Sequence, residues 1–172
     1  MLLRLAESAD AMAVARVHVR SWQVAYRGLV PDAYLDELRP QDRAARYDLA
    51  NRDPLKPQTI LAVDGAEILG FATVSPSRDP DLPDYGELCA LYAAPEHWGR
   101  GVGATLIEAA RRKLFEMGLQ RTLLWMLVGN QRAARFYQID GWRADGQRRP
   151  ALTYSGIIGD EIRYLRTIAP QE

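Results

Sequence analysis

Three glycines stand at alternate positions just before an apolar helical pattern, in the stretch APEHWGRGVGATL at residues 94–106. Gly99, Gly101 and Gly103 weaken a helix, so their placement needs a reason. The first amides of a helix have no intrahelical partner, and the helix dipole makes that end positive. A turn that leads from a strand through these glycines into a helix is therefore suited to bind the phosphates of a ligand. A tight turn that binds nothing explains the glycines about equally well.

A second motif, NQRAARFYQIDGW at residues 130–142, follows on the next strand–helix unit. Together with LYAAPEHWGRGVGATLIEAA, residues 91–110, it resembles the GCN5-related N-acetyltransferase (GNAT) family. That family has a glycine loop R/Q-x-x-G-x-G/A, followed later by N-x-x-A-x-x-F-Y. The resemblance implies one α/β domain over residues 1–172, with a central mixed β-sheet flanked by helices. It also implies an acetyl-CoA-dependent N-acetyltransferase, with acetyl-CoA as the cosubstrate.

The resemblance further implies which residues contact acetyl-CoA. Backbone groups of Leu91–Ala93 are expected to pair with the pantetheine arm, and amides from Gly99 to Ala104 to hold the pyrophosphate. Asn130 is expected near the pantetheine, and Tyr137 beside the sulfur. The complete expected cofactor set is Leu91, Tyr92, Ala93, Trp98, Gly99, Arg100, Gly101, Val102, Gly103, Ala104 and Asn130.

Two of these positions have a second interpretation. Trp98 stands where the family usually has Gln or Arg, so a phosphate contact from that side chain is missing here. Arg100 could supply the charge instead. Asn130 is also a good N-cap for the helix that follows, and the two roles are compatible.

Acetyl transfer by direct attack of an amine needs a polarised thioester carbonyl and a proton for the leaving thiolate. Backbone N–H groups around Leu91 and Tyr92 could polarise the carbonyl. Tyr137 is the candidate general acid, because a phenol with a pKa near 10 can donate to a thiolate; core packing beside Phe136 is the alternative. Glu87, on the strand that leads to the cofactor, is the candidate general base if burial raises its pKa. A solvated strand position explains Glu87 equally well.

The acceptor is the least determined part of the reaction. By resemblance, the segment RSWQVAYRGLVPDAYLDEL, residues 20–38, lines the acceptor pocket, with Trp22 and Tyr26 as predicted substrate-binding residues. Ser21 and Tyr34 are further candidate walls, and core packing of the i, i+4 pair Trp22 and Tyr26 is the alternative. The predicted acceptor is a primary amine of a small molecule. Three alternatives remain: a peptide N-terminus or lysine as the acceptor, a non-catalytic acyl-CoA-binding module, and an enzyme that binds the pyrophosphate of another nucleotide.

The elements that must position these residues follow from periodicity and turn signals. Strands are predicted over residues 2–5, 85–94, 122–128, 141–147 and 160–168, with a hairpin over 59–76 turning at Asp64-Gly65. Helices are predicted from Ser8 or Asp10 to Tyr26, and over 32–38, 41–50, 102–118 and 130–139. Apolar residues fill 122–128 without alternation, which is typical of a strand covered on both faces.

Composition narrows the classes of partner. Twenty-two basic and 22 acidic residues balance, which argues against nucleic acid. No signal peptide and no apolar run of about 18 residues is recognisable, so we expect a cytoplasmic protein without a membrane partner. Two histidines without ligand spacing and the single Cys89, interpreted as a small buried hydrophobe rather than a nucleophile, predict no metal site. Residues 160–168 could form a sheet edge, and thereby a homodimer.

Overall fold

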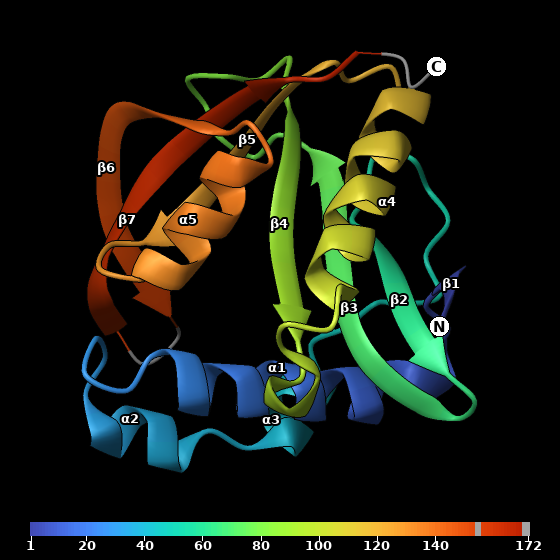
Figure 1. Ribbon diagram of the computed structural model, residues 1–172, viewed down its shortest axis with the longest axis vertical. Coiled ribbons are helices and arrows are strands. Elements are labelled where there is room, and N and C mark those ends of the chain that lie inside the picture. Colours follow the sequence, from blue (N-terminus) through green and yellow to red (C-terminus); the bar gives the residue numbers. More distant parts are fainter. Residues whose placement is uncertain (154–155, 170–172) are drawn as a thin grey trace.

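The computed structural model describes residues 1–153 and 156–169, which form a seven-stranded mixed sheet with helices on both faces (Figure 1). The strands lie in the order β1-β2-β3-β4-β5-β7-β6, and every neighbouring pair is antiparallel except β4 and β5. The strands are β1 (Leu2–Leu5), β2 (Gln58–Asp64), β3 (Glu67–Pro76), β4 (Gly86–Ala93), β5 (Arg121–Leu127), β6 (Arg143–Thr153) and β7 (Gly156–Thr167). The helices are α1 (Ala11–Ala25), α2 (Asp32–Glu37), α3 (Pro40–Ala44), α4 (Val102–Glu116) and α5 (Gln131–Ile139), with short 3-10 turns at Ser8–Asp10 and Pro95–His97.

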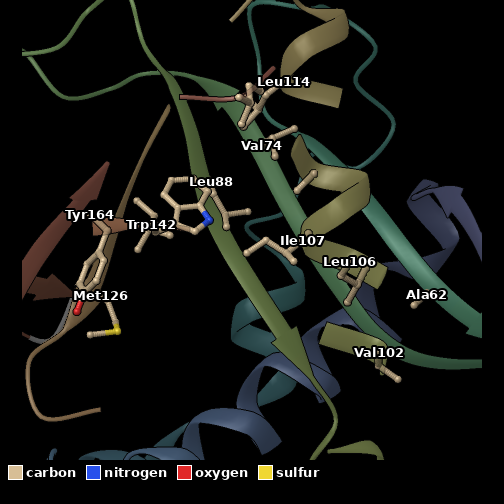
Figure 2. Packing of buried hydrophobic residues seen from close by; sticks show 14 of the residues in the cluster. Ala62, Val74, Leu88, Val102, Leu106, Ile107, Leu114, Met126, Trp142 and Tyr164 are labelled. Carbon is tan, nitrogen blue, oxygen red and sulfur yellow. The ribbon is translucent and has the colours of Figure 1, made fainter. Parts of the chain in front are cut away.

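The two faces of the sheet are buried by different helices. In β2 and β3, Ala62 and Ala72 pack in the cluster beneath α4, while their neighbours Leu61 and Phe71 pack in the cluster beneath α1. This division follows from the period of two in a strand. Figure 2 shows the first cluster, in which Leu106 and Ile107 of α4 approach the sheet beside Leu88, and Trp142 lies between Leu88 and Tyr164.

The sheet opens between β4 and β5. These two strands pair at only two registers, Gly86 with Thr122 and Glu87 with Leu123, so the parallel ladder ends where β4 still has six residues to run. A register shift opposite Thr73 and Val74 places a bulge in β4 at Cys89. Because a bulge re-aims the strand that carries it, the rest of β4 diverges from β5 and leaves an opening in the sheet.

The element order matches the sequence prediction closely up to residue 140, including the hairpin at Asp64-Gly65 and the buried strand β5. The two closing strands are longer than predicted, and residues 148–153 of β6 pair with residues 156–162 of β7. The prediction that residues 160–168 form a sheet edge is wrong, since β7 lies between β5 and β6. Arg163 of β7 is only 6 % exposed and pairs with Asp79 and Asp145. A charged residue in the sequence suggests an exposed strand, and the sequence pattern does not show that ion pairs allow this one to be buried. The edge strands of the sheet are β6 and β1.

Candidate functional site

The opening between β4 and β5 contains a cavity of about 430 Å³. One wall is β4 from Leu88 to Ala93, and the opposite wall consists of Trp125 and Met126 of β5 together with the first two turns of α5. The glycine loop and the C-terminal end of α1, with Ser21, Ala25 and the following Tyr26, line the cavity where β4 stops, since Ser21 and Trp98 both bond to the Ala93 carbonyl. Figure 1 shows why these segments meet: α4 and α5 flank β4 on one side of the sheet, and α1 crosses the end where β4 stops.

The glycine loop has the backbone geometry of an anion cradle. Gly99 and Gly101 have φ angles of 74° and 84°, which an L side chain rarely adopts. The first α4 hydrogen bond runs from the Thr105 amide to the Gly101 carbonyl at 3.0 Å. Upstream of it, five amide hydrogens meet no acceptor among the described residues: those of Gly99, Gly101, Val102, Gly103 and Ala104.

The third glycine serves helix packing. A Cβ on Gly103 would lie 3.3 Å from the ring of Phe136, so glycine here lets α4 approach α5 across the cavity. Val102 is buried in the core beneath α4, and only its amide faces the loop. The Arg100 side chain does not line the cavity.

Trp98 is held against the end of β4. Its indole Nε1 donates to the Ala93 carbonyl at 2.8 Å, and the Ser21 hydroxyl donates to the same oxygen at 2.9 Å. The Ala93 carbonyl therefore has both of its acceptor positions occupied within the protein. Of the three residues predicted to pair with a pantetheine arm, this leaves Leu91 with the freer backbone. The Ala94 amide donates to Leu69 of β3, and the alternation of an antiparallel ladder therefore turns the backbone of Tyr92 toward Phe71 of β3 as well.

Asn130 and Tyr137 are both on the cavity wall. The Asn130 side chain caps α5 by accepting from the Ala133 amide at 3.1 Å, so its N-cap role is present in the structure. Burial raises the pKa of Tyr137 above its usual range, and the neighbouring Tyr92 adds to the shift. No hydrogen bond joins the Tyr137 hydroxyl to any other described group, which leaves it available to a ligand.

Glu87 occupies an ion pair outside the cavity lining. Its two carboxylate oxygens accept from the Arg78 guanidinium at 2.7 and 3.2 Å, and one of them also accepts from the Arg78 amide at 2.9 Å. The side chain is 4 % exposed, which excludes the solvated alternative. Because Arg78 occupies both carboxylate oxygens, the geometry argues for an architectural role of Glu87; the general base remains a prediction.

The predicted acceptor residues separate into one that lines the cavity and one that does not. Tyr26 lines it, and burial raises the pKa of its hydroxyl. Trp22 lies behind Tyr26, with its ring 5.0 Å from the Tyr26 ring and 5.4 Å from the His18 ring. Ser21 also reaches the cavity, whereas Tyr34 packs beside Trp22.

Three further residues line the cavity: Cys89, Trp125 and Arg132. Burial raises the pKa of the Cys89 thiol to about 11, which keeps it protonated and a poor nucleophile at neutral pH. Sequence reasoning missed Trp125, because an apolar strand gave no reason to single it out, and Arg132, because it lay inside a motif used only for Asn130 and Tyr137. Within residues 1–153 and 156–169, no cluster of three potential metal ligands occurs, and no helix is long and apolar enough to cross a bilayer.

Comparison with known proteins gives a consistent result. The model of the Acetyltransferase (GNAT) family matches residues 18–142. An uncharacterized N-acetyltransferase of Archaeoglobus fulgidus is 32% identical over 159 residues, covering 91% of this chain and 99% of that protein. Phosphinothricin N-acetyltransferase of Streptomyces coelicolor is 28% identical over 115 residues, 67% of each chain. The crystal structure of the PaiA N-acetyltransferase from Thermoplasma acidophilum in complex with coenzyme A superposes with a TM-score of 0.76 at 18% identity, over 98% of this chain and all of that one.

Proposed function

This chain belongs to the GNAT acetyltransferase family, and we propose that it transfers an acetyl group from acetyl-CoA to a primary amine of a small molecule. The observation that carries the proposal is the cavity between β4 and β5, which has unpaired loop amides at one end and the free Tyr137 hydroxyl on its wall. The coenzyme A in the PaiA structure supports the choice of cosubstrate.

The residues present fit acetyl-CoA. Five unpartnered amides at the start of α4 suit the pyrophosphate, because backbone N–H groups and the helix dipole both favour an anion there. The unpaired stretch of β4 suits the amides of pantetheine, which can add to an exposed strand edge as a peptide does. When bound, acetyl-CoA supplies an acetyl thioester, an acyl group already activated for attack by an amine.

The chain contributes polarisation and a proton. The backbone amides around Leu91 and Tyr92 lie where the sheet opens, and we assign them to the carbonyl oxygen, whose negative charge grows as the amine nitrogen attacks. The Tyr137 hydroxyl would give its proton to the sulfur as the C–S bond breaks, and the proton that the attacking nitrogen loses would return to the Tyr137 oxygen, directly or through water. The position of this hydroxyl on the cavity wall supports the role, and burial, which raises its pKa, keeps it protonated at neutral pH.

Two features favour a small acceptor over a peptide. The α1–α2 segment packs against β6 and β7, with Tyr26 in one cluster with Leu127, Ala151 and Ile158, so the described parts of these segments are in direct contact beside the cavity. A cavity of about 430 Å³ that also holds the reactive end of the cofactor leaves room for a small amine. The likeness to a phosphinothricin N-acetyltransferase supports the same choice. A cytoplasmic location is part of the proposal, and the one unpaired thiol suits a reducing compartment.

The test is a panel of acceptors assayed for CoA thiol release, with equilibrium binding of acetyl-CoA measured in parallel. The panel contains amino acids, polyamines and aminoalkyl compounds, along with peptides bearing a free N-terminus or lysine. We expect micromolar acetyl-CoA binding and thiol release with at least one small amine. Release with peptides alone would overturn the acceptor class. Tight acetyl-CoA binding without CoA thiol release in the presence of any acceptor would favour the non-catalytic module. Tighter binding of ATP or NAD than of acetyl-CoA would show that acetyl-CoA is not the cosubstrate.

A further inference from the structure

Arg132 lies flat on the Trp98 ring at the edge of the cavity. Its guanidinium carbon is 3.5 Å from the ring centroid, which is the distance of a close stacked contact. The indole underneath is itself fixed, because its Nε1 donates to the Ala93 carbonyl at 2.8 Å. The first turn of α5 and the first residue of the glycine loop are thereby joined through one side-chain pair.

The stacked arginine has no anionic partner. Two other arginines near the opening, Arg78 and Arg163, form ion pairs with carboxylates at 2.7–3.0 Å. Arg132 forms no ion pair or hydrogen bond with any part of the chain that the structure describes, and partial burial lowers its pKa without an opposing charge. Stacking uses only the face of a guanidinium, so the N–H groups along its rim remain free to donate in the plane.

The position of Arg132 relative to the loop indicates what this cation is for. It lines the same cavity as Gly99, Gly101 and Gly103, next to the unpaired loop amides. Trp98 occupies the loop position at which the family usually has Gln or Arg, and the neighbouring Arg100 does not reach the cavity wall. The positive side chain that the loop lacks at Trp98 can therefore be supplied by Arg132 of α5.

We propose that Arg132, held on the Trp98 ring, is the side-chain cation that binds the pyrophosphate of CoA and so positions the cofactor in this protein. The inference rests on the proposed function, since it takes CoA as the ligand. Arg132 does not touch the reacting atoms and is a positioning residue. Trp98 serves as its platform and makes no phosphate contact of its own.

Equilibrium titration calorimetry with three probes tests this proposal. CoA and dephospho-CoA both contain the pyrophosphate, whereas pantetheine lacks it. For Arg132→Ala we expect Kd to rise about 10-fold or more for CoA and by the same factor for dephospho-CoA, with pantetheine binding unchanged. The salt dependence of CoA binding should also become shallower, because one phosphate–cation contact is gone. A loss for CoA alone would assign Arg132 to the 3′-phosphate and overturn the pyrophosphate assignment, and so would an unchanged Kd.

Matched variants separate the pair from a general charge effect. Arg112→Ala removes the same charge from an exposed arginine on α4 that pairs with Glu108, and should leave all three affinities unchanged. Trp98→Phe keeps an aromatic platform and should retain most of the affinity, whereas Trp98→Leu removes it. In the Trp98→Leu background, Arg132→Ala should cost clearly less than in the wild type. Additive losses would contradict the platform role.

The same data distinguish this inference from the proposed function. If the wild-type protein fails to bind CoA, the proposed function is wrong. If the wild type binds CoA and Arg132→Ala binds it equally well, only the inference about Arg132 is wrong. Thermal unfolding of each variant confirms that it is folded; Arg132 is exposed on α5, so its truncation is expected to be tolerated.

Discussion

At the scale of single residues, Tyr137 carries the clearest prediction. Its side chain is half-buried in the cavity wall, and its hydroxyl keeps its proton and has no hydrogen-bond partner in the described chain, so it can donate to a leaving thiolate. Tyr137→Phe should lower kcat about 100-fold or more while leaving the Kd for CoA within about 2-fold, since a general acid acts in the transition state. Steady-state kinetics with the best amine of the panel, beside calorimetric CoA binding, measure both.

The matched variant for Tyr137 is Phe136→Leu. Phe136 also lines the cavity and packs edge-on to Tyr137, with ring centroids 5.3 Å apart, but it has no proton to give. A packing change alone should therefore raise KM more than it lowers kcat. If Tyr137→Phe and Phe136→Leu reduce kcat equally, the hydroxyl has no role in proton transfer.

For Glu87 we expect a loss of stability without a loss of turnover. Because its carboxylate is engaged by Arg78, Glu87→Gln should lower the free energy of unfolding by about 1 to 3 kcal/mol and leave kcat nearly unchanged. Arg78→Gln, which removes the other half of the ion pair, is the matched control. Urea unfolding and the pH profile of kcat/KM are measured for both. Loss of turnover in Glu87→Gln alone, together with loss of the acidic limb of the profile, would restore Glu87 as the general base.

The sequence predicts some residue roles well and others poorly, for a physical reason. The N-cap of Asn130 and the positive φ of Gly99 and Gly101 depend on the local chain, and both are present. The Arg132–Trp98 stack and the Arg78–Glu87 ion pair join segments that meet only in the folded protein. A pattern along the chain contains no signal for either contact.

At the scale of elements, the loop before α4 combines backbone geometry with ligand binding. An alanine at Gly101, where φ is 84°, should cost about 1 to 2 kcal/mol of stability, because a Cβ clashes in the left-handed region. The backbone change that relieves this clash also displaces the unpaired amides, so the Kd for CoA should rise about 10-fold or more. Chemical unfolding and calorimetry on Gly101→Ala give the two numbers.

Gly65→Ala is the control for that experiment. Gly65 has a φ of 57° in the β2–β3 turn, and a Cβ there would also meet no atom within 4 Å. It should therefore lose comparable stability and keep its affinity for CoA. Equal weakening of CoA binding in both variants would mean that the loop acts only through global stability.

Element boundaries show where periodicity suffices. The helix α4 and the strand β5 match their predicted ranges within two residues, because each buries a regular apolar pattern. The extent of β6 and β7 was missed, since their residues 148–153 and 156–159 are mostly polar, glycine or proline and acquire strand structure only by pairing with each other. In the interior strand β7, Arg163 forms ion pairs with Asp79 of the β3–β4 connection and with Asp145 of β6, contacts that periodicity does not indicate.

At the scale of the whole molecule, the opening in the sheet is a property that no single element contains. It requires the bulge at Cys89, the short parallel ladder at Gly86 and Glu87, and α1 crossing the end of β4. The motifs indicated a cofactor site, whereas the depth of the cavity and the closure of its acceptor end come from packing between α1–α2 and β6–β7. The packing of α1 against β3 and β4 buries a histidine, which ties the stability of the molecule to pH.

His18 of α1 is buried, with its ring 4.6 Å from that of Tyr92 and its Nδ1 2.8 Å from the Tyr47 hydroxyl, and burial with Arg43 nearby lowers its pKa well below 6.5. The unfolded chain therefore binds a proton that the folded protein does not, so stability is full above pH 6.5 and falls below it by about 1.4 kcal/mol per pH unit. Urea unfolding between pH 7.5 and 5.5 measures this slope above the range where ordinary carboxyl groups titrate.

The variant His18→Phe should flatten the pH dependence of the unfolding free energy, although its absolute stability is lower because the Tyr47 hydroxyl is left unpaired. The control His97→Gln should retain the pH dependence. A wild-type slope that persists in His18→Phe would show that another group couples folding to protons.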